Sequence, residues 1–333
     1  MLPPGHAKLP ARLNPSEKHM PTLEEYYETY KETYILPATK PTTQATYENS
    51  FNHILPKLGQ LRLEQITRLD VEKLISHLML DKKLSRGTIH NIVAALSACL
   101  SHAGERGIIV GNPTYRTSKL YRHPRKGLEE IKPLTEEEAQ RFLQAAWRHV
   151  REWYELFLMA LHTGIRSSEL AGLQWNDIDF DNKCLMVKRQ IIWREVQTTK
   201  SNRTRRIDLS TALLQALKAL KKRRQEQWLK RGKNEIPPWV FCSQAGNPMD
   251  MQNVKRRYFK KALEKAGLKK IRFHDLHHTF ATLLIQNNEP LPYVQQQLGH
   301  SSIKLTVDTY THWMPGKDRE AMDRLPALET GIH

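Results

Sequence analysis

Apolar residues recur at helical spacing along the first third of the chain. The clearest case is the segment 85–103, where they return every three or four positions and leave polar residues elsewhere. Segments 42–58 and 67–80 show the same periodicity. A further helix is predicted to begin at Thr22, because Thr22 and Glu25 have the spacing of a capping box. The pattern therefore predicts a compact helical domain of about four helices.

The pattern changes in the second part of the chain. Thr135 and Glu138 again have capping-box spacing, which predicts the first helix of a new domain. Between residues 175 and 209 apolar and polar residues alternate, as in short antiparallel strands. The apolar positions of this stretch include Cys184, Met186, Ile191 and Trp193. Helical character returns from Ser210, so the predicted fold class is mainly α with a small antiparallel β-sheet.

These patterns divide the chain into four parts. We predict a flexible tail at 1–20, a helical domain at 21–118, a basic linker at 119–132 and an α+β domain at 133–333. The linker region is basic, carries aromatic residues and lacks apolar periodicity, as expected of a segment that follows a phosphate backbone. It could equally be a solvated linker whose charges only aid solubility.

The charge balance points to a polyanionic partner. The 333 residues include 52 Lys and Arg against 35 Asp and Glu, a net charge of +17, and the pI is about 9.7. Nucleic acid is the first candidate for such an excess. A protein that is simply basic, or one that binds anionic lipid, remains the alternative.

Other composition features exclude several classes of protein. The mean hydropathy of −0.61 and the lack of an apolar run near 18 residues argue against a membrane span. The N-terminus lacks an apolar signal core. The three cysteines are far apart and show no CxxC spacing, so neither a disulfide framework nor a cysteine zinc site is expected. We expect a cytoplasmic protein.

The last part of the chain concentrates residues suited to phosphoryl transfer. His274, His277 and His278 occupy positions i, i+3 and i+4 at the start of a predicted helix, and His300 and Tyr310 follow. A tyrosine hydroxyl is a poor nucleophile unless cations and proton acceptors surround it. The three histidines could instead bind a metal, but no HExxH glutamate or cysteine partner accompanies them.

Two further segments could complete such a site. Gly164 is predicted to end an apolar helix, which places Arg166 at the start of the next one. Arg166 could hold two phosphate oxygens, with Glu169 fixing its guanidinium, although a surface Arg–Glu pair would look the same. Lys200, at the tip of a predicted hairpin, could protonate a leaving oxygen.

Taken together, the motifs resemble those of the tyrosine recombinase, or phage integrase, family. The resemblance covers about residues 20–315 and rests on five segments in a fixed order. They are TGIRSSEL at 163–170, TTKS at 198–201, HDLHHTFAT at 274–282, LGHSS at 298–302 and DTYTH at 308–312. It implies a helical core-binding domain followed by a catalytic domain.

The resemblance also implies roles for individual residues. Tyr310 would be the nucleophile that forms a 3′-phosphotyrosyl link, and Arg166 and His300 would stabilise the phosphorane. His274 would assist removal of the Tyr310 proton, and Lys200 would protonate the leaving oxygen. The broken bond's energy is kept in the phosphotyrosine, so no cofactor, ATP or divalent metal is expected.

One position departs from the family pattern. The helix should carry His-x-x-Arg, but His277 stands where the arginine is expected. Losing one preorganised phosphate clamp costs roughly 10²–10³ in rate. A His277 protonated by the adjacent phosphate would partly replace the missing cation.

The resemblance implies a site-specific DNA recombinase, with an integrase of a phage or mobile element favoured over a chromosome-dimer resolvase. Its partners would be double-stranded DNA carrying recombination sites and three further copies of the chain in a tetramer, with room for accessory directionality factors. Two alternatives stay open. One is a catalytically weakened or inactive DNA-binding member of the family, and the other is a type IB topoisomerase.

Overall fold

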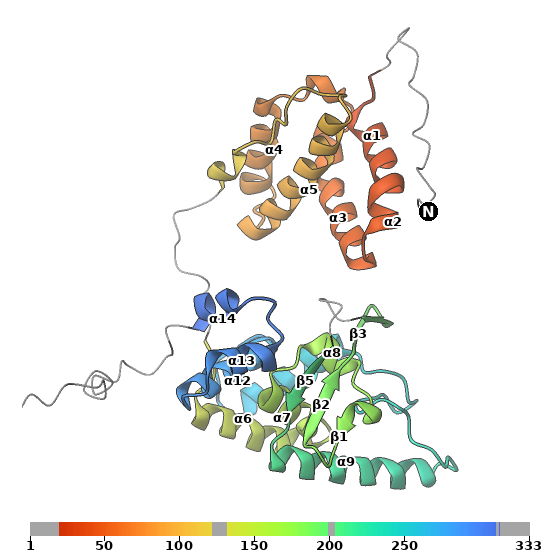
Figure 1. Ribbon diagram of the computed structural model, residues 1–333, viewed down its shortest axis with the longest axis vertical. Coiled ribbons are helices and arrows are strands. Elements are labelled where there is room, and N and C mark those ends of the chain that lie inside the picture. Colours follow the sequence, from red (N-terminus) through yellow and green to blue (C-terminus); the bar gives the residue numbers. More distant parts are fainter. Residues whose placement is uncertain (1–19, 122–131, 199–203, 311–312, 314–333) are drawn as a thin grey trace, which may run out of the picture. The chain divides into compact units, whose positions relative to one another are not determined.

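The computed structural model describes residues 20–121, 132–198, 204–310 and 313 (Figure 1). The chain forms two compact units, Met1–Leu128 and Glu129–His333. The predicted tail 1–20, except Met20, and most of the predicted linker 119–132 lie outside the described residues. The boundary between the units falls within that linker segment.

Unit 1 is helical throughout its regular elements. Thr22 and Thr67 cap two of its helices, and each side chain accepts a hydrogen bond from the backbone N–H three residues on. Ser85 caps a third helix, so the helices of this unit begin close to the predicted residues. The main helices are α1 (Leu23–Tyr30), α2 (Leu36–Ala38), α3 (Pro41–Leu58), α4 (Arg68–Leu80) and α5 (Arg86–Glu105).

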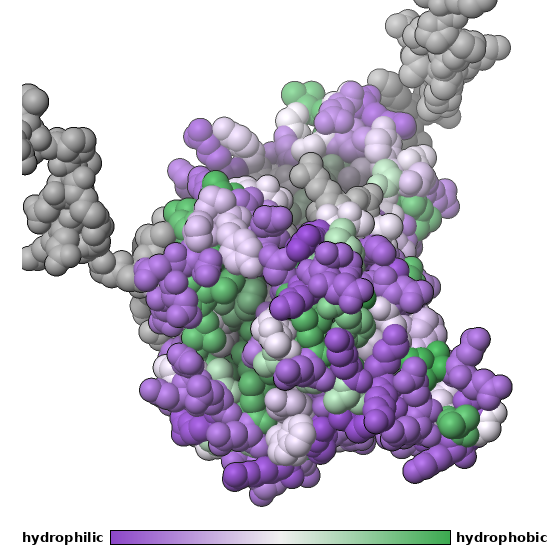
Figure 2. All heavy atoms as spheres, turned by 60° about the horizontal axis from the view of Figure 1, so that its bottom comes forward, coloured by the Kyte–Doolittle hydropathy of each residue, from purple (hydrophilic) through white to green (hydrophobic). Residues whose placement is uncertain are grey.

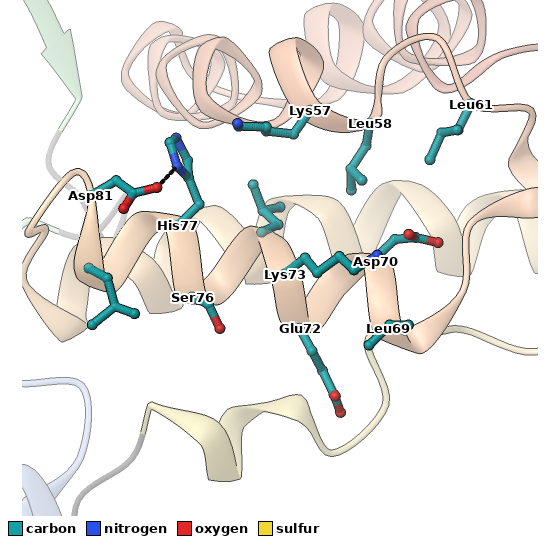
Figure 3. Close-up of a pocket in the computed structure, with 12 residues that line it drawn as sticks. Lys57, Leu58, Leu61, Leu69, Asp70, Glu72, Lys73, Ser76, His77 and Asp81 are labelled. Carbon is teal, nitrogen blue, oxygen red and sulfur yellow. Dashed lines mark hydrogen bonds and ion pairs between the residues drawn. The ribbon is translucent and has the colours of Figure 1, made fainter.

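The interior of unit 1 is packed with aliphatic and aromatic side chains. Tyr27 stacks on Phe51 with ring centroids 3.6 Å apart, which joins α1 to α3. Between α3 and α4 lies a surface hollow of about 610 Å³ (Figure 3). Its polar rim includes Lys57 and the hydrogen-bonded pair His77 and Asp81. This hollow contains none of the residues predicted to be catalytic, all of which belong to unit 2.

Unit 2 is built around one buried helix. Every residue of α7 (Tyr154–Thr163) from Glu155 to Leu161 is buried, which accounts for its apolar character on all sides. Three helices pack against α7: α6 (Glu136–His149), α9 (Thr211–Leu229) and α12 (Asp275–Gln286). Thr135 forms the predicted capping box at the start of α6.

The described part of unit 2 contains the short antiparallel strands that the alternating pattern predicted, but they form two small sheets and not one. One has the order β1-β2-β5, and the other is the β3-β4 hairpin. The strands are β1 (Ile178–Asp179), β2 (Cys184–Val187), β3 (Arg189–Ile192), β4 (Glu195–Thr198) and β5 (Arg205–Asp208). Trp193 is not a strand residue as predicted: it lies in the β3-β4 turn with φ of 50°, and its side chain is exposed.

The C-terminal helices of unit 2 gather beside β5. α13 (Leu291–Leu298) contacts α12, α14 (Ile303–Tyr310) and β5, and these helices are blue in Figure 1. The face in Figure 2, on the side of α6 and α9, is mostly hydrophilic with small, separated hydrophobic patches. Within the described residues, no helix combines the length and apolar character needed to cross a membrane.

Candidate active site

The turn after α7 positions Arg166. Gly164 ends α7 in the left-handed region with φ of 57°, and a Cβ there would lie 2.5 Å from Cδ1 of Phe280. Glycine therefore satisfies both the backbone conformation and the close packing on α12. Arg166 follows at the N-cap of α8 (Ser167–Ala171), and its side chain is 30% exposed.

Glu169 is buried behind Arg166, but Arg166 is not its main partner. Arg205, on β5, donates two hydrogen bonds to the Glu169 carboxylate, at 2.8 and 2.7 Å, whereas the Arg166 Nη1 lies 3.4 Å away. Burial alone would raise the pKa of Glu169, but the hydrogen bonds and charge of Arg205 outweigh burial and lower it. Glu169 thus contacts the Arg166 guanidinium, and through Arg205 it also ties α8 to β5, which was not predicted.

The histidines at the start of α12 occupy three different environments. His274 lies at the N-cap and is exposed, whereas His277 is 3% exposed. Their rings are stacked, with centroids 4.9 Å apart and an interplanar angle of 14°. His278 lies on the side facing α14. Partial desolvation, and then the positive charge of Arg166, lower the pKa of His274.

His277 is held as a neutral imidazole. Its Nδ1–H donates to the carbonyl oxygen of Gly164, so in the neutral ring Nε2 carries a lone pair and no proton. Burial lowers the pKa of His277 well below its usual value, although the Gly164 carbonyl opposes this effect. Without a bound phosphate, the His277 ring therefore carries no positive charge. Its Nε2 instead lies 3.5 Å from Nε2 of His300.

His300 lies in the short connection between α13 and α14. Gly299 ends α13 with φ of 65°, and the Nδ1 of His300 is hydrogen-bonded at 2.9 Å to the hydroxyl of the buried Thr306. With the hydroxyl as donor, His300 carries its proton on Nε2, which lies 3.5 Å from the unprotonated Nε2 of His277. Burial and then Arg166 lower the pKa of His300 to about 4, so the ring is neutral at pH 7.

Tyr310 is fully buried at the end of α14, where it packs against α12 and α13. Its hydroxyl is 2.7 Å from Nδ1 of His278, and its ring lies parallel to that of His300 with centroids 6.4 Å apart. Burial raises the pKa of Tyr310, and the nearby charge of Arg166 opposes that rise. The imidazole at the phenol is therefore that of His278, not that of His274 as predicted.

Arg166, Glu169, His274, His277, His300 and Tyr310 thus belong to one cluster in unit 2. The remaining predicted residue, Lys200, lies outside the described residues. Among the residues that the structure describes, no group of three or more His, Cys, Asp or Glu is arranged to hold a metal ion.

Comparison with known protein families settles the family. Residues 132–316 match the model of the phage integrase family, and residues 22–79 match the N-terminal SAM-like domain of phage integrases. The chain belongs to the phage integrase family. It is thus a tyrosine-type site-specific DNA recombinase, as the motif order predicted.

Relatives and solved structures agree with this assignment. A tyrosine recombinase XerC-like protein of Caldanaerobacter subterraneus is 30% identical over 92% of this chain and 83% of its own length. The ICEBs1 integrase of Bacillus subtilis is 28% identical over 83% of this chain and 75% of its own length. A solved structure of the Tn1549 transposon integrase with a circular intermediate DNA is 25% identical, with a TM-score of 0.77, and covers 92% of this chain and 100% of its own.

Sequence reasoning missed three residues of the cluster. Arg205 was one of several basic residues on a hairpin, and only the fold shows that it meets Glu169. His278 was noted for its helical spacing, but Tyr310 is 32 positions away in the chain. Lys255, whose ammonium donates to the hydroxyl of Ser167 at 2.8 Å, gave no local signal.

Proposed function

We propose that Tyr310 is the nucleophile of this recombinase and that His278 accepts its proton. The hydrogen bond between the Tyr310 hydroxyl and the imidazole of His278 carries this assignment, because it joins a phenol to a neutral base inside the cluster that contains Arg166. Burial and then the charge of His274 lower the pKa of His278 to about 4, so its ring is neutral at pH 7 and a ring nitrogen lone pair can accept the hydrogen bond of the phenol.

The phosphate would lie against the exposed side of the cluster. Arg166 can donate from its guanidinium to two non-bridging oxygens, and the Nε2–H of His300 can donate to one of them. His274, at the exposed N-cap of α12, is the third proposed donor. His277 would fix the positions of its two histidine neighbours and add no charge itself.

The proposed step balances atoms and charge. The Tyr310 oxygen forms a bond to phosphorus as the bond from phosphorus to the 5′ oxygen breaks. The phenol proton passes to His278, and the leaving oxygen takes a proton, for which Lys200 is the proposed donor. The phosphodiester becomes a 3′-phosphotyrosine, and attack by a 5′ hydroxyl from a second strand restores a DNA backbone.

We extend the proposal to domains and partners. Segments 21–118 and 133–333 would act as the core-binding and catalytic domains, on duplex DNA with specific recombination sites. A solved structure of lambda integrase, similar in fold with a TM-score of 0.68, is a tetramer bound to a Holliday junction. A tetramer of this chain on paired sites, assisted by accessory factors, is the proposed working form.

A covalent-adduct assay tests the proposal. The substrate is DNA from beside the gene, nicked near the crossover so that a cleaved strand cannot be rejoined. Wild type should accumulate a protein–DNA adduct, and Tyr310→Phe should form none. Tyr293→Phe is the matched control, because Tyr293 lies on the neighbouring helix α13 and bonds to Asp208. An adduct with Tyr310→Phe would refute the assignment of the nucleophile.

A further inference from the structure

The part of the active-site cluster that the structure describes carries little positive charge. His277 is neutral and its Nδ1–H is used by Gly164, and His300 is neutral as well. Among the described predicted site residues, Arg166 is then the one cation that can face a phosphate, since Arg205 is committed to Glu169. Catalysis of phosphoryl transfer depends mainly on positioning and on stabilising the charge on the phosphoryl oxygens. A second cation would correct this deficit.

Lys255 lies between the two segments that carry Arg166 and His274. Its ammonium donates to the hydroxyl of Ser167, the residue after Arg166, at 2.8 Å. It also lies 5.6 Å from the ring centroid of Phe273, the residue before His274. Two chain segments more than one hundred residues apart therefore hold this one ammonium group at the cluster.

The environment of Lys255 is unusual for a lysine with a purely structural role. Its side chain is half-buried, yet no carboxylate among the described residues pairs with it. Burial lowers the pKa of Lys255, and its positive charge helps to lower the pKa of His274. A half-buried cation without a counter-ion becomes more stable when an anion binds beside it.

The local backbone also distinguishes this position. Lys255 lies in the π-helical segment Val254–Phe259, between the short helix α10 (Met251–Asn253) and α11 (Lys260–Lys265). Such segments are rare and occur frequently at functional sites. Ser167 and Phe273 leave two of the three ammonium protons without a hydrogen-bond acceptor among the described residues.

We propose that Lys255 is a catalytic residue that binds a non-bridging oxygen of the scissile phosphate together with Arg166, and so supplies the positive charge that His277 does not. The inference rests on the proposed function of the Tyr310 cluster. It differs from the role proposed for Lys200, which concerns the proton of the leaving oxygen.

The first experiment measures adduct formation with the nicked substrate. Lys255→Met should lower the rate of adduct formation by roughly 10- to 100-fold at saturating DNA. This loss is smaller than the one expected when a fully preorganised hydrogen-bond donor is removed. Lys255→Arg should retain most of the activity. Lys260→Met is the matched control, because Lys260 is an exposed lysine in the next helical segment and its ion-pair partner among the described residues is Glu264. An equal loss for both Met variants would overturn the proposal.

The second experiment separates a phosphate-binding role from a structural one. A methylphosphonate at the scissile position removes the negative charge of the non-bridging oxygens. On this substrate Lys255→Met and wild type should react at similar rates, within about threefold. If Lys255 only supports Ser167 and α8, the variant loses the same factor on both substrates, and the proposal is wrong.

A third substrate tests for a proton donor. A 5′-bridging phosphorothiolate has a leaving group that needs no protonation. Specific rescue of Lys255→Met by this substrate would overturn the proposal, because Lys255 would then act on the leaving oxygen. Adduct formation by wild type in the same assay tests the proposed function separately. The role of Lys255 can therefore fail while the proposed function of the Tyr310 cluster stands.

Discussion

At the scale of single residues, His277 and His278 are adjacent in the chain and differ in what they can do. His277 has its Nδ1–H on the Gly164 carbonyl and a buried ring, so its chemistry is used inside the protein. His278 presents a nitrogen to the Tyr310 hydroxyl. In the proposed mechanism, the backbone hydrogen bond of His277, more than its residue type, leaves His278 as the base.

Replacement of His277 by arginine should accelerate cleavage. Arginine stays charged and can donate several hydrogen bonds, so His277→Arg should raise the rate of adduct formation by about 10-fold or more. The same change should reduce the effect of Lys255→Met, because the two cations act on one phosphate. A His277→Arg variant that folds normally but reacts no faster than wild type would contradict this prediction.

The hydrogen bond between His278 and Tyr310 should be measurable as a coupling energy. His278→Phe leaves the buried Tyr310 hydroxyl without its partner, which should lower the free energy of unfolding by about 1–3 kcal/mol. The double variant with Tyr310→Phe should lose less than the sum of the single changes, because no polar group is then left unpaired. Urea unfolding of wild type, the two single variants and the double variant completes the double-mutant cycle. Additive losses of unfolding free energy would argue against a hydrogen bond between His278 and Tyr310.

At the scale of elements, the junction between α7 and α8 depends on Gly164. Gly164→Ala would place a Cβ 2.5 Å from the Phe280 ring at a positive φ, so unfolding free energy should fall by about 2–4 kcal/mol and Arg166 should shift. Gly267→Ala is the control: its φ is also positive, but nothing lies within 4 Å. It should cost about 1 kcal/mol. Equal losses in thermal or urea unfolding would exclude packing against Phe280 as the cause.

The local elements were largely predictable from the sequence. Caps at Thr22, Thr67, Ser85 and Thr135 have short-range signals, and the structure shows a helix beginning at each. The active-site contacts were less predictable. Lys255 and Ser167 are 88 positions apart, and Glu169 and Arg205 are 36 apart. No local pattern encodes such a pair, so the family motifs named the cluster but not its hydrogen bonds.

At the scale of the whole molecule, the buried histidines should make stability depend on pH. The pKa values of His278 and His300 are about 4 in the folded chain, against about 6.5 for an unperturbed histidine. Between these values the unfolded chain binds protons that the folded chain does not. Stability should therefore fall as pH decreases from 6.5 towards 4.

Urea unfolding at pH 7.5, 6.5, 5.5 and 5.0 measures this loss of stability, because this series of pH values enters the interval between the unfolded and folded pKa values of the two histidines. These pH values stay above the range in which Glu169 and other carboxylates with lowered pKa values contribute. A variant with both His278→Gln and His300→Gln should show a flatter dependence than wild type. The same slope in both proteins would assign the effect to other groups.

The net charge of +17 should make DNA binding sensitive to salt. Binding by many lysines and arginines releases counterions, so the logarithm of the binding constant should fall linearly with the logarithm of salt concentration. Lys255→Met and Lys260→Met should each reduce the slope by about one at most. Fluorescence anisotropy at several salt concentrations measures it, and a slope near zero would contradict electrostatic binding.

The burial of Tyr310 has a consequence for unwanted cleavage of DNA. The phenol of Tyr310 is buried and hydrogen-bonded to the imidazole of His278, so a DNA strand in contact with the protein surface does not reach it. The proposed role of Tyr310 as nucleophile requires that its hydroxyl become accessible to the phosphate, and the hydrogen bond to His278 opposes that exposure.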